Sequence, residues 1–192
     1  LMKCHDAVVL SKGELCVLKT LYELSRWNKI FVDVGAHVGY FSLIGAVQVG
    51  PTGTVLSYEP DPEVFRYLQR NVAPYPWVHA QRLAIADRVG YLTFYRTPRQ
   101  QESGWGSLFN GGEGRSAIQV ATSTLDEQVI AHHLQRVDLV KVDVEGAEVR
   151  VLEGACALLK RYRPIWVLEI NAPCLARDGR RPEDVHRLLQ EA

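Results

Sequence analysis

Two acidic residues and two glycines are spaced along residues 29–59 in a pattern that could hold a ligand. Asp33, Gly35 and Gly39 lie in KIFVDVGAHVGYFSL, between an apolar stretch typical of a strand and one typical of a helix. Gly35 lets the backbone turn sharply and approach a ligand, and Gly39 lets the helix pack close to the strand. Glu59 lies 20 residues beyond Gly39, where an acid can accept hydrogen bonds from the hydroxyl groups of a ribose.

The spacing of the glycines and the acid before them indicate which ligand is bound. The pattern is G-x-x-x-G, and His37 stands where the dinucleotide-binding loop G-x-G-x-x-G has its middle glycine. This bulkier loop disfavours a pyrophosphate, and Asp33 would attract an ammonium group, such as the amino-acid end of S-adenosylmethionine. Two alternatives stay open: a nicotinamide-dependent dehydrogenase with the same strand, turn and acid, or glycines and an acid that only form a turn and a strand end.

Further acids lie at the predicted ends of later strands, at the same edge of the sheet as the predicted ligand loop. Asp143 ends the predicted fourth strand and is the first candidate for a general base, with Glu145 beside it. His37 is another candidate base, and each of the three could instead be a turn or packing residue. Glu169 and Asn171 follow the next strand, and together with Asp143 they could bind magnesium through oxygen ligands.

Short apolar segments alternate with helix-like segments along most of the chain. Strands are predicted at residues 30–34, 53–59, 78–84, 137–144 and 164–170, and helices at 13–26, 39–49, 62–72, 124–134 and 146–160. This alternation predicts an α/β fold with a doubly wound, mostly parallel sheet, because parallel neighbours need crossover helices that cover both faces. Between the third and fourth strands, residues 88–122 predict an inserted β-hairpin with a lid that includes Trp105, Ser107 and Phe109.

Length and composition predict one soluble domain. The 192 residues include 22 basic and 22 acidic side chains, so no overall field favours nucleic acid or an anionic membrane. No apolar run is long enough to span a bilayer, and the four scattered cysteines form no metal-ligand pair, which favours a reducing cytoplasm. We expect a single domain over residues 1–192, with a helical N-terminal segment at 1–27 and a cofactor-binding core at 28–192.

Several segments follow one another in a recognisable order: FVDVGAHVGYFSL, YEPDPEVFRYLQRNV, LAIADRVGYLTF, STLDE, VDLVKVDVEGAEVRVLEGA and RPIWVLEI. In these segments the chain resembles the FkbM family of S-adenosylmethionine-dependent methyltransferases, within the class I methyltransferase superfamily. The resemblance implies a Rossmann-like fold and these cofactor-binding residues: Asp33, Gly35, Ala36, Gly39, Glu59, Pro60, Ala86 and Asp87. In this family Glu59 would bind the ribose, Asp87 would lie near the adenine amino group, and Pro60 and Ala86 would flank the ring. The superfamily's C-terminal strand pair has no counterpart in this chain, so that edge of the sheet is expected to be missing.

The expected activity follows from this resemblance and from the acids predicted at the cleft. The resemblance implies an S-adenosylmethionine-dependent methyltransferase of the EC 2.1.1 type, acting on a hydroxyl group of a small molecule or a glycan. A nicotinamide-dependent dehydrogenase and a non-catalytic cofactor-binding module are the alternatives. S-adenosylmethionine is the expected cofactor, and magnesium is a candidate addition.

Overall fold

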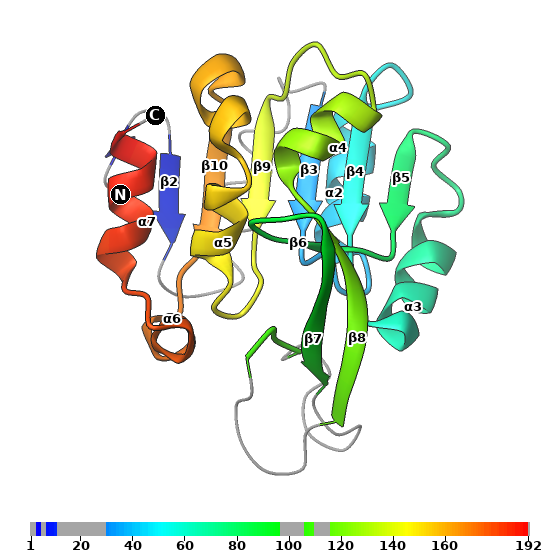
Figure 1. The fold of residues 1–192 in the computed structure, drawn as a ribbon. Coiled ribbons are helices and arrows are strands. Elements are labelled where there is room, and N and C mark those ends of the chain that lie inside the picture. Colours follow the sequence, from blue (N-terminus) through cyan, green and yellow to red (C-terminus); the bar gives the residue numbers. More distant parts are fainter. Residues whose placement is uncertain (1–2, 5–6, 11–29, 97–105, 110–115, 192) are drawn as a thin grey trace.

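The computed structural model describes residues 3–4, 7–10, 30–96, 106–109 and 116–191, and its main feature is a seven-stranded sheet (Figure 1). The strands are β1 (Lys3–Cys4), β2 (Ala7–Leu10), β3 (Ile30–Val34), β4 (Thr54–Tyr58), β5 (Val78–Gln81), β9 (Leu139–Val142) and β10 (Ile165–Glu169). Their order across the sheet is β1-β2-β10-β9-β3-β4-β5, and every pairing is parallel except that of β1 with β2. The predicted doubly wound α/β sheet is confirmed.

Helices cover both faces of this sheet because its strands are apolar on both sides. The helices are α2 (Tyr40–Val49), α3 (Pro62–Val72), α4 (Leu125–Ala131), α5 (Glu148–Glu153), α6 (Ala172–Leu175) and α7 (Pro182–Gln190). In β3, Phe31 packs with apolar residues of α2 and α3, whereas Val32 packs in the larger cluster with residues of α4, α5 and α7. Val55 and Leu56 repeat this alternation in β4, as is typical of parallel strands buried on both faces.

Local sequence signals determine where two of the helices begin. Asp61 caps α3, because its side chain accepts hydrogen bonds from the backbone N–H groups of Glu63 and Val64 at 2.8 and 3.3 Å. Pro62 occupies the first turn of α3, where its missing N–H group has no helical partner to lose. Thr124 caps α4 through its side-chain oxygen. The predicted helices at 62–72 and 124–134 therefore start where their sequences indicate.

The predicted helix at 146–160 is divided in the structure. α5 ends just before Gly154, and a π-helical turn follows at Leu158–Tyr162. A Cβ added to Gly154 would lie 2.1 Å from a carbonyl oxygen of the loop that follows β6 (Ala84–Ile85), so the two backbones are in close contact. Asp126 of α4 then accepts hydrogen bonds from the backbone N–H groups of Ala157 and Leu158, both at 2.8 Å. These long-range contacts interrupt the helix, and helical periodicity does not reveal them.

A second sheet of three strands, β6, β7 (Gly90–Arg96) and β8 (Ser116–Ser123), has the order β6-β8-β7. β7 and β8 pair in antiparallel register, which confirms the predicted hairpin, and they extend beyond the carboxyl ends of the parallel strands (Figure 1). The single strand predicted at 78–84 is wrong: β5 ends at Gln81, and Ala84 begins β6. Ala84 leaves the main sheet because it packs with Phe94 and Val120 in the apolar cluster of the hairpin.

The edge of the main sheet beyond β10 is formed by the first strands of the chain. β2 pairs in parallel with β10, and β1 folds back on β2. These strands correct the expectation of a helical segment over residues 1–27, since the apolar run AVVL forms a strand, and the helix predicted at 13–26 lies outside the described residues. Residues 170–191 contain no strand. β2 therefore occupies an edge of the sheet that was expected to be missing.

None of the helices that the structure describes is long and apolar enough to cross a membrane.

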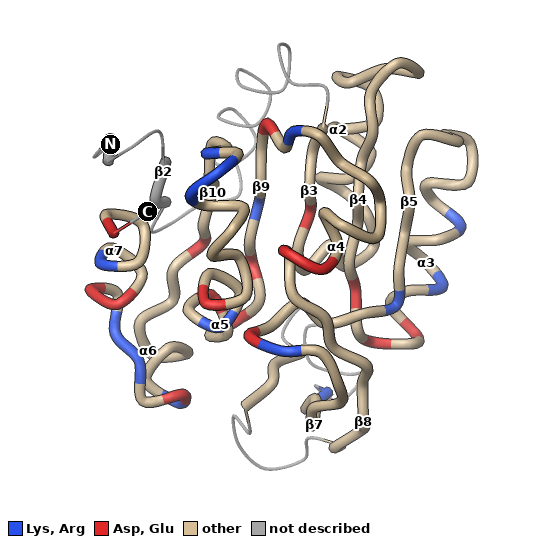
Figure 2. The backbone as a smooth tube through the Cα atoms, turned by 45° about the horizontal axis from the view of Figure 1, so that its top comes forward, with Lys and Arg blue, Asp and Glu red and all other residues tan. Residues whose placement is uncertain are grey.

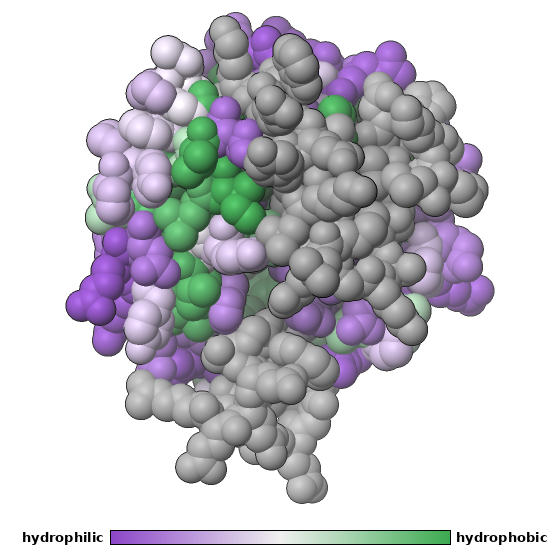
Figure 3. Space-filling model, turned by 180° about the vertical axis from the view of Figure 1, so that it is seen from behind, coloured by the Kyte–Doolittle hydropathy of each residue, from purple (hydrophilic) through white to green (hydrophobic). Residues whose placement is uncertain are grey.

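Seen from behind, the molecule shows a group of apolar side chains with polar ones around it (Figure 3). This is the side on which α2 lies, and 64% of Val47 in that helix is exposed. α2 therefore carries apolar residues on its outer face as well as on its inner one.

Candidate active site

A cleft of about 1510 Å³ opens at the carboxyl ends of β3, β4 and β9, where doubly wound sheets bind their ligands. It is lined by the loops that follow these strands, by part of α3 and by the hairpin. Seven of the predicted site residues line it: Gly35, Ala36, His37, Glu59, Pro60, Asp143 and Glu145. Pockets for one small molecule commonly measure about 300–1,000 Å³, so this cleft has room for a cofactor and a second molecule.

The loop after β3 bends through backbone conformations that few side chains allow. Gly35 has a φ of 78°, and a Cβ there would lie 1.9 Å from the carbonyl oxygen of Asp143, so glycine is required. His37 has a φ of 51°, and Glu145, in the loop after β9, has a φ of 50°. Such values are uncommon for residues other than glycine, and they gather at functional sites. Both loops line the cleft, which favours a binding role for them.

Glu59 lies just beyond β4, and only 6% of it is exposed. Its Oε2 accepts a hydrogen bond from the backbone N–H of His37 at 3.0 Å, and its Oε1 accepts one from that of Asp61 at 2.8 Å. These bonds fix the carboxylate, and each oxygen keeps a lone pair for a further donor. Burial raises the pKa of Glu59 to about 7, although the two backbone bonds oppose the shift. Additional hydroxyl donors would therefore favour its ionised form.

The second glycine of the predicted loop, Gly39, packs two helices together. A Cβ added to it would lie 2.8 Å from Cδ1 of Leu68 in α3, and Gly39 does not line the cleft. The prediction that Gly39 brings the helix close to the strand is therefore wrong. Gly45 of α2 does so instead, since a Cβ there would lie 2.2 Å from Cδ1 of Phe31 in β3. The sequence shows both glycines but not which surface each one faces.

Buried polar side chains form a layer beneath the cleft. The Ser57 hydroxyl donates to Oγ of Ser42 at 2.8 Å, and the Ser42 hydroxyl donates to Oδ2 of Asp33 at 2.7 Å. Oδ1 of Asp33 lies 3.7 Å from Nζ of Lys141. Burial raises the pKa of Asp33, and Lys141 and Ser42 oppose that shift. Asp33, predicted to meet the ammonium group of a ligand, thus meets that of Lys141 and does not itself line the cleft.

The candidate catalytic acids lie in the loop after β9. Asp143 lines the cleft with 28% of its side chain exposed, and its Oδ2 lies 3.4 Å from Nζ of Lys141. Glu145 also lines the cleft, and its Oε2 is 3.5 Å from Sγ of Cys174. His37 has a buried Nε2 without a hydrogen-bond partner among the described residues. All three candidates lie at the cleft, and Asp143 is the one that contacts a buried cation.

Glu148 lies behind this loop and does not line the cleft. Its Oε1 accepts a hydrogen bond from the backbone N–H of Gly146 at 3.0 Å, while the rest of the side chain is buried. Burial raises the pKa of Glu148 to about 7. This carboxyl group therefore shapes the turn before α5 and is a feature of stability more than of ligand contact.

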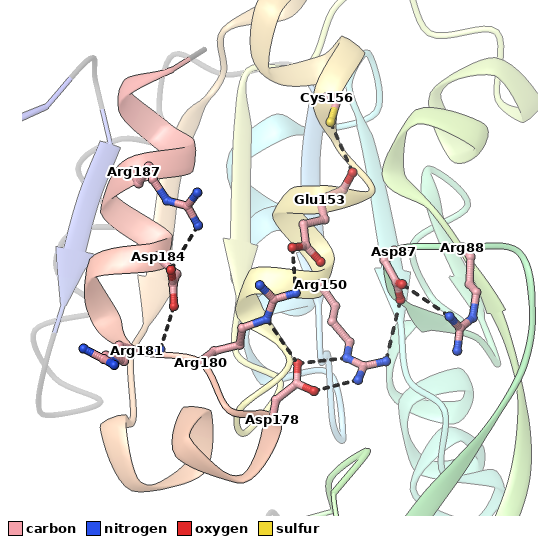
Figure 4. A network of polar contacts seen from close by, with 10 residues as sticks. All are labelled: Asp87, Arg88, Arg150, Glu153, Cys156, Asp178, Arg180, Arg181, Asp184 and Arg187. Carbon is pink, nitrogen blue, oxygen red and sulfur yellow. Dashed lines mark hydrogen bonds and ion pairs between the residues drawn. The ribbon is translucent and has the colours of Figure 1, made fainter.

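Asp87 and Ala86, predicted to lie at the adenine, are adjacent to the cleft and are not part of its lining. The carboxylate of Asp87 forms ion pairs with Arg88 at 3.6 Å and with Arg150 at 3.8 Å (Figure 4). Arg150 also donates two hydrogen bonds to Asp178, at 2.9 and 2.6 Å. Arg150 of α5 thus connects the predicted adenine-binding acid to the segment that precedes α7.

The described part of the predicted lid lies against the loop after β9. The Ser107 hydroxyl donates a hydrogen bond to the carbonyl oxygen of Glu145 at 2.8 Å. The guanidinium carbon of Arg150 lies 5.2 Å from the centre of the Phe109 ring, within the range of a cation–π contact. Trp105 lies outside the described residues. Ser107 and Phe109 therefore hold this segment next to both the candidate catalytic loop and the Asp87 network.

The magnesium prediction finds no support in the arrangement of its ligands. Within the described ranges, no group of three or more histidine, cysteine, aspartate or glutamate side chains is placed to hold a metal ion. Asn171 caps α6 instead, since its Oδ1 accepts a hydrogen bond from the backbone N–H of Cys174 at 3.4 Å. The oxygen of Asp143 that could bind a cation already lies beside Lys141.

Lys141 and Arg150 are the residues at this site that the sequence prediction missed. A lysine inside the apolar run VDLVKVDV is a usable signal, because charged residues are almost never fully buried unless they are paired. Arg150 has no comparable signal, since its partner Asp178 lies 28 residues away and outside any strand. The role of Lys141 could therefore have been predicted from the sequence, whereas that of Arg150 depends on the fold.

The chain is a doubly wound α/β protein with a ligand site at the carboxyl ends of its strands. The site combines the glycine turn after β3, the buried acid after the neighbouring strand β4 and the cleft that they line. The FkbM methyltransferase domain matches residues 33–192, and the chain belongs to this family. The family assignment implied by the sequence motifs is thereby confirmed.

Curated relatives agree with this assignment. Hexuronic acid methyltransferase AglP of Haloferax volcanii is 29% identical over 182 residues, which cover 94% of this chain and 70% of the relative. The 2-O-methyltransferase NoeI of Sinorhizobium fredii is 26% identical over 161 residues, 74% of this chain and 64% of the relative. Among solved structures, methyltransferase FkbM from Methylobacillus flagellatus has a TM-score of 0.48 at 19% identity, covering 71% of this chain and 31% of that one. The chain thus spans only part of each of these proteins.

Proposed function

We propose that the chain is an S-adenosylmethionine-dependent methyltransferase that acts on a hydroxyl group of a small molecule or a glycan. The observation that carries the proposal is Glu59, a buried carboxylate that the backbone N–H groups of His37 and Asp61 hold at the cleft. Its remaining lone pairs suit the two hydroxyl groups of a ribose. Membership of the FkbM methyltransferase family supports the same function.

The residues of the cleft fit an adenosyl ligand that has no phosphate groups. Gly35 leaves the backbone open where a side chain would collide with the loop after β9. His37 interrupts the close glycine packing that a pyrophosphate needs, which disfavours the nicotinamide dinucleotides. Asp87, which Arg150 holds beside the cleft, would receive the adenine amino group.

The chain would promote transfer by alignment, proton removal and exclusion of water. The methyl donor supplies an electrophilic methyl group, and a carbon–oxygen bond to the acceptor forms as the carbon–sulfur bond breaks. Glu59 would fix the donor at its ribose, and Asp143, which is partly exposed in the cleft, would accept the proton of the acceptor hydroxyl. Ser107 and Phe109 hold the lid segment beside the cleft, where it would exclude water.

A glycan acceptor is supported by the cleft rim and by the relatives. Tyr40 and Tyr67 line the cleft and are exposed, so their ring faces are available to a sugar. Arg66 and Arg70 of α3 line the same rim and are exposed, and an arginine can pair with a sugar carboxylate. The relative AglP is named as a hexuronic acid methyltransferase, which agrees with an acidic sugar at this rim.

Isothermal titration calorimetry tests the proposal. S-adenosylhomocysteine should bind the chain and NAD should not, and Glu59→Ala should weaken binding by on the order of 1–3 kcal/mol through the lost ribose bonds. Glu127→Ala is the matched control, because Glu127 is exposed on α4 and does not line the cleft. Asp143→Asn should abolish turnover and leave this affinity nearly unchanged. Binding of NAD without binding of the adenosyl ligand would replace the proposal with a dehydrogenase.

A further inference from the structure

Lys141 is a largely buried cation that is part of the lining of the candidate site. It is 2% exposed and lies within β9, where its neighbours Val140 and Val142 are fully buried apolar residues. A lysine is almost never buried to this extent without partners, because removing an ammonium ion from water is costly. Its position therefore requires compensation by nearby negative charge.

Carboxylates from two neighbouring strands supply this charge. Parallel pairing places Lys141 of β9 directly opposite Asp33 of β3, with Nζ 3.7 Å from Oδ1 of Asp33. The same Nζ lies 3.4 Å from Oδ2 of Asp143. Glu169, at the end of β10, adds a further electrostatic attraction. Figure 2 shows acidic positions along β3, β9 and β10 and a basic position within β9.

Other contacts hold the ammonium group in place. Nζ of Lys141 lies 4.6 Å from the centre of the Phe41 ring, which is favourable for a cation. The Ser42 hydroxyl fixes the second oxygen of Asp33, so that Oδ1 remains directed to Lys141 without a hydrogen bond of its own. Burial by itself lowers the pKa of Lys141, but Asp143 and Asp33 raise it, and the net shift is upward. Asp143 and Asp33 therefore favour the charged form of Lys141 in this layer.

We propose that the Lys141 ammonium takes the place of a divalent cation between Asp33 and Asp143, so that cofactor binding and methyl transfer by this chain need no metal ion. The inference rests on the proposed function. Lys141 acts as a positioning residue: it holds the Asp143 carboxylate at the cleft, where Asp143 would accept the proton of the acceptor.

The geometry leaves little room for a metal at this point. Magnesium needs nearly octahedral oxygen ligands at about 2.0–2.1 Å, and the oxygens of Asp33 and Asp143 that face each other are separated by an ammonium group. A dication that approached Asp143 would be repelled by this positive charge at short range and low dielectric. The ammonium is covalently attached to β9, so a chelator cannot remove it.

The first arm of the test uses the unaltered chain. Its affinity for S-adenosylhomocysteine is measured by calorimetry in excess EDTA and in excess magnesium chloride, and its thermal midpoint is measured with and without manganese chloride. We expect the two affinities to agree within about twofold and the midpoint not to respond to manganese, since a ligand that binds only the native state would raise it. An affinity that is lost in EDTA and restored by magnesium overturns the proposal.

The second arm removes the ammonium. Lys141→Ala leaves Asp33 and Asp143 without this ammonium, so manganese chloride should raise the thermal midpoint of this variant, and a further Asp143→Asn change should abolish the response. Lys160→Ala is the matched control, because Lys160 is exposed and remote from the cleft lining. A folded Lys141→Ala protein whose thermal midpoint does not respond to manganese contradicts the proposal.

The two arms separate this inference from the proposed function. If S-adenosylhomocysteine binds the unaltered chain in neither EDTA nor magnesium, the proposed function fails. If it binds only with magnesium, the function stands and the role of Lys141 is refuted. Should Lys141→Ala fail to fold, the measurements on the unaltered chain decide the question.

Discussion

Acidification from about pH 7.5 to about pH 5.5 should weaken the binding of S-adenosylhomocysteine by about twentyfold, because Glu59 must be ionised to accept two ribose hydroxyl groups. In the free chain its carboxylate already accepts hydrogen bonds from the backbone N–H groups of His37 and Asp61. Its charged neighbours Asp61 and Asp33 raise the pKa further. Each added hydroxyl donor stabilises the ionised form, so binding lowers the pKa of Glu59 and releases a proton.

The magnitude follows from the pKa of about 7 that burial gives Glu59. At that pKa the ionised fraction is roughly three quarters at about pH 7.5 and roughly 3% at about pH 5.5. The affinity of a ligand that selects the ionised form changes by the ratio of these fractions, about 25. Some binding to the protonated form brings the expected change to about twentyfold, and the proton released at about pH 6 approaches one per ligand.

Calorimetry in two buffers of different ionisation enthalpy measures both the affinity and the number of protons released. Glu59→Gln is the control, since it keeps the shape of the side chain and cannot ionise. The variant should bind S-adenosylhomocysteine more weakly at about pH 7.5, and its affinity should depend much less on pH. Any remaining pH dependence then belongs to the ligand or to other groups of the cleft. An equal pH dependence of the affinity in the variant and in the unaltered chain would show that Glu59 does not carry the ribose contact.

The remaining predictions concern stability and are tested by urea titration. Gly35→Ala should lower the free energy of unfolding by about 2–5 kcal/mol, because the added Cβ meets a backbone carbonyl at 1.9 Å. Gly50 also has a positive φ but has open space around it, so Gly50→Ala should lower the free energy of unfolding by about 1–2 kcal/mol. Glu148 has its pKa raised from 4.5 to about 7, so its contribution to stability is full below about pH 4.5 and is lost as the pH rises through about 7. Glu148→Gln should therefore gain about 3 kcal/mol relative to the unaltered chain between these pH values, and an unchanged difference would refute the argument. Arg150→Ala should lower the free energy of unfolding by about 1.5–3 kcal/mol, because it removes two hydrogen bonds to a buried carboxylate. Arg187→Ala removes only a surface ion pair and should lower the free energy of unfolding by less than about 0.5 kcal/mol.

Local patterns were sufficient to predict most of the fold. IFVDV and LVKV are short apolar runs, and each becomes a strand buried on both faces. The hairpin is predicted by two alternating segments around a polar stretch, and the helix predicted at 62–72 begins at Pro62, as the structure has it. Each of these features depends on residues close together in the chain, which is why sequence periodicity identifies them.

The features that sequence missed depend on contacts between distant segments. The pairing of β2 with β10 cannot be derived from the run AVVL, because any parallel edge could accept it. Gly39 immediately precedes α2 and Gly45 lies within it, but which one contacts the strand and which one contacts α3 depends on how the helices pack. The contact of Asp33 with Lys141 depends on the register between β3 and β9, since a shift of one residue would turn Lys141 to the opposite face.

The buried polar layer also bears on whether the chain is an enzyme or only binds a cofactor. A replacement of paired buried charges by apolar residues is often neutral or stabilising, so the Lys141–Asp33 contact is poorly explained as a device for stability. Cofactor binding, as proposed, needs Glu59 and the turn at Gly35, and neither contacts Lys141 through a hydrogen bond or ion pair that the structure describes. The layer instead holds Asp143, the one candidate base that is both open to the cleft and next to a fixed cation. Charges fixed before the reaction need no reorganisation as the acceptor loses its proton, and that advantage exists only if a reaction takes place there.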